Sequence, residues 1–335
     1  MTSTHTACGF AAIPKRIAAW TPILAGLAAW GAACALWSMD LAEAFLLFAP
    51  LVIVPLGLRL IDDEGTIDLT AREISARMIR TAKRLQLPAA ILLACGFAAP
   101  PGAVAGWSAV PWLAFTLLCA VAGGLRLLDP SRLRRADRWM IDAALVLIAV
   151  GGVNTFAYRG GIAVGDFPEG IILLTGVHFH YAGFALPLLT ARAIAARPGR
   201  FATATSLAVV ATIVLVGVGI TFSPALELAA SLGLIAACVS VAGLQFVAAD
   251  DVRSPLAWTL LMISALALVA GMSVAGVYAI GEYRFSTGLD PGPKPIDIPA
   301  MIPLHGALNG LGFSLCGLLA WNLHRGTRSI EPRTK

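Results

Sequence analysis

Charged side chains are scarce in this sequence. Only 13% of the 335 residues are Asp, Glu, Lys or Arg, whereas 58% are hydrophobic. A soluble globular domain usually has about a quarter charged residues. Apolar runs of roughly 20 residues recur instead, which is the length needed to cross a bilayer core of about 30 Å. The composition excludes a soluble protein and predicts an all-α, polytopic transmembrane helix bundle.

Other absences exclude several classes of function. The six cysteines are scattered without a CxxC pair, so neither a disulfide framework nor a cysteine metal site is indicated. The sequence has no GxSxG elbow, no HExxH motif and no Gly-rich phosphate loop. Its net charge of +5 comes from basic residues in short loops between apolar runs, not from a basic domain. We therefore expect no nucleic-acid partner.

We expect about ten membrane spans within a single transmembrane domain that covers residues 1–335. The apolar runs place these spans near residues 17–38, 41–60, 87–104, 108–127, 139–157, 169–190, 201–222, 225–248, 256–281 and 298–323. Lys15 and Arg16 precede the first run without a cleavable signal pattern, so this run is expected to be a retained span.

Basic residues are distributed unevenly over the loops of this arrangement. With both termini in the cytoplasm, the inner side holds all of the 24 Lys and Arg residues except Arg159, Arg284 and Lys294. This bias is the one that the positive-inside rule requires. Residues 61–86 then form a cytoplasmic loop, and residues 324–335 form a basic cytoplasmic tail. Within the loop, residues 69–86 fit either an amphipathic helix on the inner leaflet or a plain basic loop.

Strongly polar residues occur inside several of these spans. A charged side chain at mid-span costs about 2.5–3.5 kcal/mol on insertion scales, so such residues normally face the protein interior. At 1.5 Å per residue, His178 lies roughly 13–14 Å below the outer end of span six, and His305 lies roughly 10 Å below that of span ten. Asn309 is one turn deeper than His305. The remaining candidates lie nearer the outer surface, namely Asn154 in span five and Glu43, Glu169 and Glu282 at the outer ends of spans two, six and nine.

This distribution predicts one polar cavity that opens from the outer leaflet or the outer aqueous side. Glu43, Glu169 and Glu282 are expected at its mouth, and a solvated position is favoured over a catalytic one for Glu43 and Glu169. The inner half of the spans contains little beyond Asp142 and Gln245. We interpret Asp142, beside the basic loop, as an anchor at the inner edge.

Span ten has the clearest helical pattern. One face carries His305, Asn309, Gly312 and Cys316, at i, i+4, i+7 and i+11. An adjacent face carries small residues suited to close helix packing, namely Gly306, Gly310, Ser314 and Gly317. The pattern predicts a helix inside the bundle whose histidine and asparagine point inward.

Span six carries two histidines on different faces. His178 and His180 point about 200° apart on a regular helix, so they cannot share one site, whereas Tyr181 can share a face with His178. Either one histidine is structural or the helix is distorted. Three residues would permit such a distortion, namely Gly176, Gly183 and Pro187. The sequence leaves open whether one or both histidines are functional.

Two stretches of the sequence resemble a known family. The segments "TGVHFHYAGFALPLL" (175–189) and "LHGALNGLGF" (304–313) are similar to the YndJ-like family of bacterial membrane proteins, with a weaker similarity around "GGVNTFAYRGG" (151–161). The resemblance implies a multi-pass protein of the bacterial cytoplasmic membrane. It gives added weight to the residues in its motifs, His178, His180, Tyr181, His305 and Asn309, without naming a reaction.

The polar residues favour an enzyme embedded in the membrane. Histidines with an amide partner can act in general acid–base catalysis, by isomerisation, cyclisation or hydrolysis. The candidate catalytic residues are His178, His180, His305, Asn309, Tyr181 and Asn154. A site at this depth fits a hydrophobic small molecule from the lipid bilayer, such as a lipid or isoprenoid-like substrate.

Two alternatives remain open. A transporter or proton-coupled permease is possible, although no inverted repeat or pair of broken helices is evident. A metal- or haem-binding membrane protein is the other, since a HxH pair and a distant histidine could bind zinc. We expect no metal and no cofactor, because HxH chelation suits strands and loops better than helices. The sequence does not specify the oligomeric state.

Overall fold

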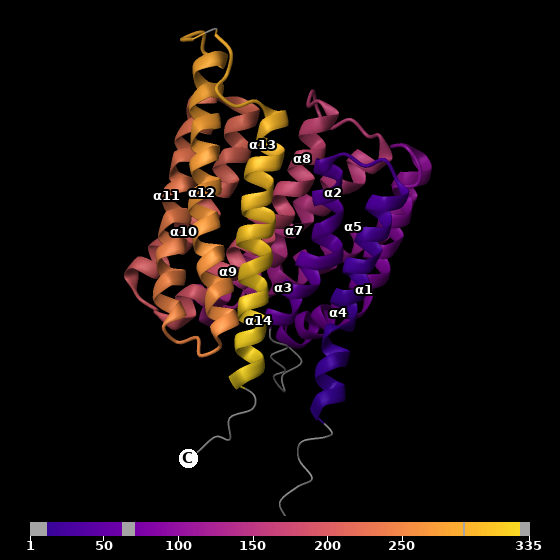
Figure 1. The fold of residues 1–335 in the computed structure, drawn as a ribbon, viewed down its shortest axis with the longest axis vertical. Coiled ribbons are helices and arrows are strands. Elements are labelled where there is room, and N and C mark those ends of the chain that lie inside the picture. The colour runs from indigo at the N-terminus through magenta and orange to yellow at the C-terminus, as the bar shows by residue number, and fades with distance from the viewer. Residues whose placement is uncertain (1–11, 62–70, 291, 329–335) are drawn as a thin grey trace, which may run out of the picture.

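A computed structural model describes residues 12–61, 71–290 and 292–328. Every regular element in these ranges is helical (Figure 1), which confirms the predicted all-α polytopic bundle. The elements, with η for π-helical segments, are α1 (Ala12–Leu36), α2 (Leu41–Phe48), η1 (Ala49–Ile53), α3 (Val54–Leu60), α4 (Ala71–Gly96), α5 (Ala103–Leu127), α6 (Pro130–Leu133), α7 (Ala136–Gly160), α8 (Glu169–His180), η2 (Tyr181–Ala185), α9 (Leu186–Ala196), α10 (Arg200–Phe222), α11 (Pro224–Ala249), α12 (Pro255–Ser286), α13 (Ile298–Gly306), η3 (Ala307–Leu315) and α14 (Cys316–Arg328).

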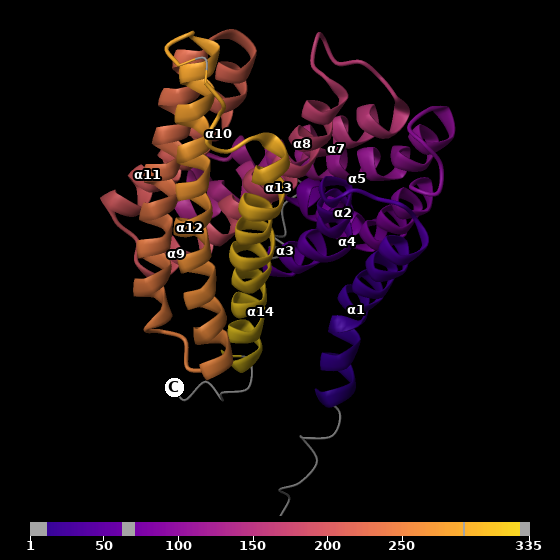
Figure 2. The same cartoon turned by 45° about the horizontal axis from the view of Figure 1, so that its top comes forward.

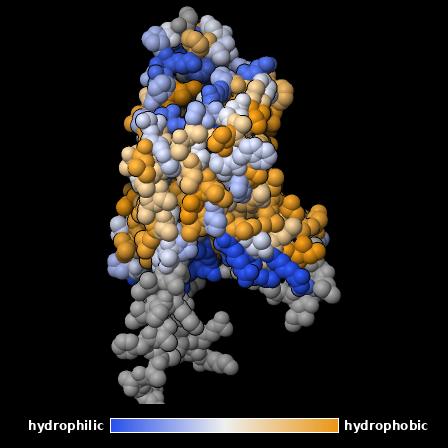
Figure 3. All heavy atoms as spheres, turned by 90° about the vertical axis from the view of Figure 1, so that its right-hand side faces the viewer, coloured by the Kyte–Doolittle hydropathy of each residue, from blue (hydrophilic) through white to orange (hydrophobic). Residues whose placement is uncertain are grey.

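Eight continuous helical stretches are long and apolar enough to cross a membrane. They are Leu41–Leu60, Ala103–Leu127, Ala136–Gly160, Glu169–Ala196, Arg200–Phe222, Pro224–Ala249, Pro255–Ser286 and Ile298–Arg325. Trp20–Leu36 is apolar but shorter. Apolar side chains cover the middle of the face in Figure 3, and hydrophilic residues gather toward its ends. The helix α1 begins and α14 ends at the same end of the bundle (Figure 1), as an even number of crossings requires.

The third predicted span has different boundaries in the structure. A single helix, α4, joins the second half of the expected cytoplasmic loop to the beginning of that span. It ends at Gly96, because Pro100 and Pro101 follow within one turn and cannot continue a helix. Its inner half packs on the bundle, where Ser75 donates a hydrogen bond to the carbonyl of Ala122 (3.0 Å). Residues 62–70 of that loop and residues 329–335 of the predicted tail lie outside the described residues.

Three spans contain a π-helical segment. The segments η1, η2 and η3 interrupt the second, sixth and tenth predicted spans without breaking the helix. In η2 the N–H of Leu186 bonds to the carbonyl of Tyr181, five residues back, and Pro187 has no N–H with which to continue this register. Of the two possibilities that the sequence left open for span six, a structural histidine or a distorted helix, the structure shows a distortion, a π segment beside Pro187. Such segments occur frequently at functional sites.

The segment η1 shows how the bundle satisfies the backbone that a π turn leaves unpaired. The N–H of Val54 bonds to the carbonyl of Ala49, so the carbonyl of Pro50 faces Pro55, which has no N–H. Gln86 of α4 donates its side-chain amide to the Pro50 carbonyl at 2.6 Å. A buried carbonyl without a partner is costly in the membrane, and Gln86 removes that cost.

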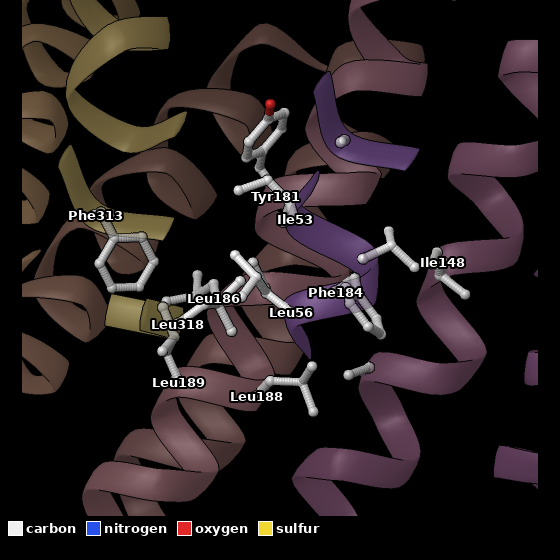
Figure 4. Close-up of a cluster of buried hydrophobic side chains, with 14 of the residues drawn as sticks. Ile53, Leu56, Ile148, Tyr181, Phe184, Leu186, Leu188, Leu189, Phe313 and Leu318 are labelled. Atoms are coloured by element: carbon white, nitrogen blue, oxygen red, sulfur yellow. The ribbon is translucent and has the colours of Figure 1, made fainter. Parts of the chain in front are cut away.

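The tenth predicted span, α13–η3–α14, lies between two groups of helices. Figure 2 shows α10, α11 and α12 on one side of it and α2, α7 and α8 on the other. The three π-containing spans meet here, because η2 contacts both η1 and η3. Figure 4 shows their shared apolar core, in which Ile53, Leu56, Phe184, Leu186, Phe313 and Leu318 lie together.

A buried ion cluster joins α5, α6 and α7. Asp142 is fully buried and forms salt bridges with Arg126 (2.8 Å) and Arg132 (2.6 Å). These arginines belong to the loop region that the charge bias places on the inner side. The geometry is that of the anchor expected for Asp142.

Candidate functional site

His178 and His305 lie next to each other. His178 is in the last turn of α8 and His305 is in the last turn of α13, and their ring centroids are 6.1 Å apart. His178 is exposed, and His305 is half-buried. The structure thus brings together two of the predicted residues from spans that are more than 100 residues apart in the sequence.

Backbone carbonyls fix the tautomer of both rings. The Nδ1 atom of His178 lies 2.7 Å from the carbonyl oxygen of Leu174, and Nδ1 of His305 lies 2.9 Å from that of Gly271 in α12. A carbonyl can only accept, so each Nδ1 carries a proton and donates it. Each neutral ring then has its lone pair on Nε2. Neither Nε2 has a hydrogen-bond partner in the described part of the chain.

Asn309 supports His305 from one turn below. Its amide donates to the backbone carbonyl of His305 at 3.1 Å. The same nitrogen is 3.2 Å from Nδ1 of His305, which is a contact and not a second bond, because that Nδ1 already donates to Gly271. Gly271 has to be a glycine here, since a Cβ atom at this position would overlap the amide of Asn309. Asn309 and Gly271 therefore act together to hold the His305 ring.

Tyr181 and Phe45 lie beneath the histidine pair. The hydroxyl of Tyr181 donates to the backbone carbonyl of Phe45 at 3.0 Å, and Figure 4 shows this oxygen directed away from the apolar core. The Phe45 ring packs against Gly306 and Gly310, and the Tyr181 ring also touches Gly310. The small-residue face predicted for span ten thus contacts α2 and η2. Tyr181 shares this region with His178, but its hydroxyl is engaged by the backbone.

His180 points to the other side of the helix. It is fully buried and stacks on Trp112 of α5, with ring centroids 5.7 Å apart. Its Nδ1 donates to the carbonyl of Gly176 (2.7 Å), and its Nε2 accepts the indole N–H of Trp112 (3.0 Å). Both nitrogens are used, so His180 has no free atom for a substrate.

Asn154 and the expected mouth residues are not part of the pair's immediate surroundings. Asn154 donates to the carbonyl of Val150 in its own helix (2.9 Å). Glu169 is exposed at the first residue of α8. Glu282, near the C-terminal end of α12, forms a salt bridge with Lys294 (2.6 Å).

Glu43 differs from the solvated residue that the sequence suggested. It accepts a hydrogen bond from the hydroxyl of Tyr158 at 2.6 Å and lies 3.6 Å from the guanidinium of Arg159. Arg159 is buried and also donates to the carbonyl of Gly96 (2.9 Å), the last residue of α4, and to that of Ala99 (2.5 Å) in the turn that follows. Glu43 thus belongs to a structural cluster at the end of the bundle that the charge bias predicts to be the outer one.

Sequence reasoning did not identify Gly271, Trp112 or Arg159 as partners. No local pattern could have found them, because each meets its partner from a different span. In the residues that the structure describes, no three His, Cys, Asp or Glu side chains gather as a possible metal site. The HxH motif places one ring beside His305 and the other beside Trp112, so it does not form a chelating pair.

Comparison with known proteins shows which family the chain resembles. The family described as "YndJ-like protein" matches residues 44–313, which include both His178 and His305. The chain is 29% identical over 221 residues to a protein of Bacillus subtilis (strain 168), "Uncharacterized membrane protein YndJ". That alignment covers 65% of this chain and 38% of the relative, so the chain spans less than half of the relative's length. No solved structure matches the chain. Since the family match extends over most of its length and over the histidine pair, the chain belongs to the YndJ-like family of membrane proteins.

Proposed function

We propose that the protein is a membrane-embedded enzyme that acts on a lipid or isoprenoid-like substrate through His178 and His305. The observation that carries the proposal is the approach of two imidazoles to 6.1 Å, each with Nδ1 fixed by a carbonyl and Nε2 unpaired. Unpaired polar atoms at this depth are costly and are retained mainly at functional sites. Fixed orientation of a base is also what general acid–base catalysis needs.

The pair can catalyse a proton-neutral reaction. The Nε2 atom of one neutral imidazole takes a proton from the substrate and becomes an imidazolium. The same proton then returns to a different atom of the substrate, which completes an isomerisation or a cyclisation without another reagent. Hydrolysis would consume one water molecule in addition. The neighbouring imidazole, whose ring centroid is 6.1 Å away, can orient the substrate through its own Nε2 lone pair.

The surroundings favour a substrate that arrives from the bilayer. His178 is exposed on a helix of membrane-spanning length, roughly 13–14 Å from its outer end by helical rise. Leu304, next to His305, is 50% exposed. An apolar tail could therefore stay in contact with lipid while the polar part of the molecule reaches the histidines.

A transporter is the second candidate, and the three adjoining π segments are the observation in its favour. Helix interruptions near the bilayer midplane are typical of secondary transporters. The interruptions here are π turns within continuous helices, however, and no half-helix ends are directed at the histidine pair. An enzyme therefore remains the preferred proposal. For the metal- or haem-binding alternative, the candidate ligands are His178 and His305.

Lipid profiling of a deletion strain tests the proposal. The strain is complemented with the natural gene, with His178→Ala, with His305→Ala, or with His324→Gln. His324 packs on Trp321 at the other end of the last helix and serves as a matched histidine control. We expect both alanine variants to show the same accumulated lipid as the deletion strain, whereas His324→Gln restores the natural profile. Normal profiles in both alanine variants, at natural expression levels, would overturn the enzyme proposal.

A further inference from the structure

The His178–His305 site offers hydrogen-bond acceptors at its reactive atoms. Each Nδ1 proton is donated to a backbone carbonyl, so each Nε2 presents a lone pair. The nearby Tyr181 hydroxyl donates to Phe45, and the Asn309 amide donates to the His305 carbonyl. The Tyr181 hydroxyl and one of the two N–H groups of Asn309 are therefore engaged with the backbone, and the contact of the same amide nitrogen with the His305 ring is at Nδ1. A ligand that satisfies both imidazoles has to bring its own polar hydrogen.

We infer that the site recognises an amphiphile whose polar head is a hydrogen-bond donor, either an alcohol or an amine. This inference deepens the proposed function and rests on it. The ring separation of 6.1 Å allows one small head group to contact both rings, because a hydrogen-bonded atom lies about 3 Å from each nitrogen. An ammonium group can donate to both lone pairs at once. A hydroxyl group donates to one Nε2 and becomes the proton source for the proposed reaction.

Anionic head groups fit the neutral pair poorly. A carboxylate or a phosphodiester brings only acceptor oxygens, which would face the two Nε2 lone pairs. Binding such a head would require proton uptake by one ring beforehand. A metal ion is a third way to satisfy lone pairs, but the described residues supply no third side chain of the usual ligand types at the pair.

The tail of the ligand has an apolar surface available on both sides of His305. Leu304 precedes it and is 50% exposed, and Leu311 lies further along η3 and is 40% exposed. No charged residue occurs in α13 or η3. An unbranched or isoprenoid chain can therefore lie along this helix while its head reaches the two imidazoles.

Photolabelling of the purified full-length protein in nanodiscs tests the head-group preference. The four probes share one long alkyl chain with a diazirine and an alkyne, and they end in a primary alcohol, a primary amine, a methyl ether or a carboxylic acid. Labelling is measured at pH 8 by fluorescence after attachment of a dye, and labelled peptides are identified by mass spectrometry. The variants are His178→Phe and His305→Phe, with His324→Gln as the control. Thermal stability of each variant is recorded so that loss of folding is recognised.

We expect the alcohol, the amine or both to label peptides of α8 or α13 about fivefold more than the ether and the acid. This is the ratio that roughly 1 kcal/mol of net hydrogen bonding gives. The preference should disappear in both phenylalanine variants and persist in His324→Gln. Preference for the alcohol or for the amine identifies which donor the site takes.

Other results would reject the inference. If the acid or the ether labels as strongly as the alcohol and the amine, and this labelling still depends on the histidines, the preference for a hydrogen-bond donor is refuted while the proposed site remains in place. Labelling that is absent, or unchanged in folded phenylalanine variants, would refute recognition of these probes by the histidine pair. Lipid profiles of the alanine variants would then decide separately whether the enzyme proposal survives.

Discussion

At the residue scale, the difference between His178 and His180 follows from helix geometry. Two positions along a helix correspond to a rotation of about 200°, so one ring faces His305 and the other faces Trp112. His180 has a partner on each nitrogen and is fully buried. His178 has a partner on Nδ1 and an unpaired Nε2. Substitution should therefore destabilise the protein strongly at His180 and hardly at His178.

We predict that His180→Ala lowers the free energy of unfolding by roughly 3 kcal/mol or more, whereas His178→Ala changes it by less than about 0.5 kcal/mol. The first change removes a buried ring and leaves the Trp112 N–H without an acceptor. The second removes an exposed side chain whose one hydrogen bond is local. Thermal unfolding of both purified variants in the same detergent measures the difference. Equal destabilisation by the two substitutions would contradict these assignments.

The sequence predicted part of this picture at the residue scale. The i, i+2 spacing predicted that the two histidines cannot share a site on a regular helix, and helical rise placed His178 and His305 at similar expected depths. Spacing alone does not say which face of a helix meets which neighbour. For the same reason Glu43 was expected to be solvated, although Tyr158, 115 residues away, binds it.

At the element scale, η2 determines where His178 points. A π turn adds one residue to a helix. The side chains that precede the turn are therefore rotated by about 100° about the helix axis relative to their positions in a regular α-helix. His178 is three residues before η2, and the helix α9 after it is buried among several neighbours. The π segment therefore sets the register between the packed half of this span and the half that carries His178.

We predict that deletion of Ala182 converts η2 to a regular helix and separates His178 from His305. The measurement is intramolecular cross-linking of a His178→Cys/His305→Cys protein by a short thiol-reactive reagent, scored by intact mass, with the native cysteines replaced. We expect efficient cross-linking in the parent and a loss of at least fivefold after the deletion. Insertion of one alanine after His178 in the deleted protein should restore it, and Ala182→Ser should leave it unchanged. Cross-linking that persists in the deletion variant would show that η2 does not orient His178.

The interruptions were only partly predictable from the sequence. Pro187 with Gly176 and Gly183 permitted a distortion in span six, because proline leaves a carbonyl without its donor, but the sequence did not decide whether one forms. Pro50 and Pro55 carry the same signal around η1. The segment η3 contains no proline, so its π geometry depends on packing between spans. The boundary of α4 was missed for a related reason, since its basic inner half is held by tertiary contacts such as that of Ser75.

At the scale of the whole molecule, the distribution of basic residues determines on which side of the membrane we expect the histidine pair. All Lys and Arg residues but three lie on the expected inner side, while both histidines of the pair lie within roughly 15 Å of the expected outer ends of their spans. The buried cluster of Asp142, Arg126 and Arg132 lies on the basic side. If this orientation is correct, the site is reached from the outer leaflet.

The last prediction is therefore the orientation itself. Reporter fusions after Arg132 and Ala195 should report the cytoplasm, and fusions after Val164 and Gly288 the opposite side, because translocation of the Arg-rich loops is disfavoured. A fusion at residue 65 extends the test to the loop outside the described residues. A membrane-impermeant thiol reagent added outside intact spheroplasts should also label a Ser286→Cys protein that lacks its native cysteines, because Ser286 is exposed at the end of α12. The same reagent should label an Arg197→Cys protein only after lysis. Arg197 is exposed at the end of α9 and provides the matched inner position. A signal from the outer side after Arg132, or labelling of the Arg197→Cys protein in intact spheroplasts, would reverse the bundle and place the histidine pair on the cytoplasmic side.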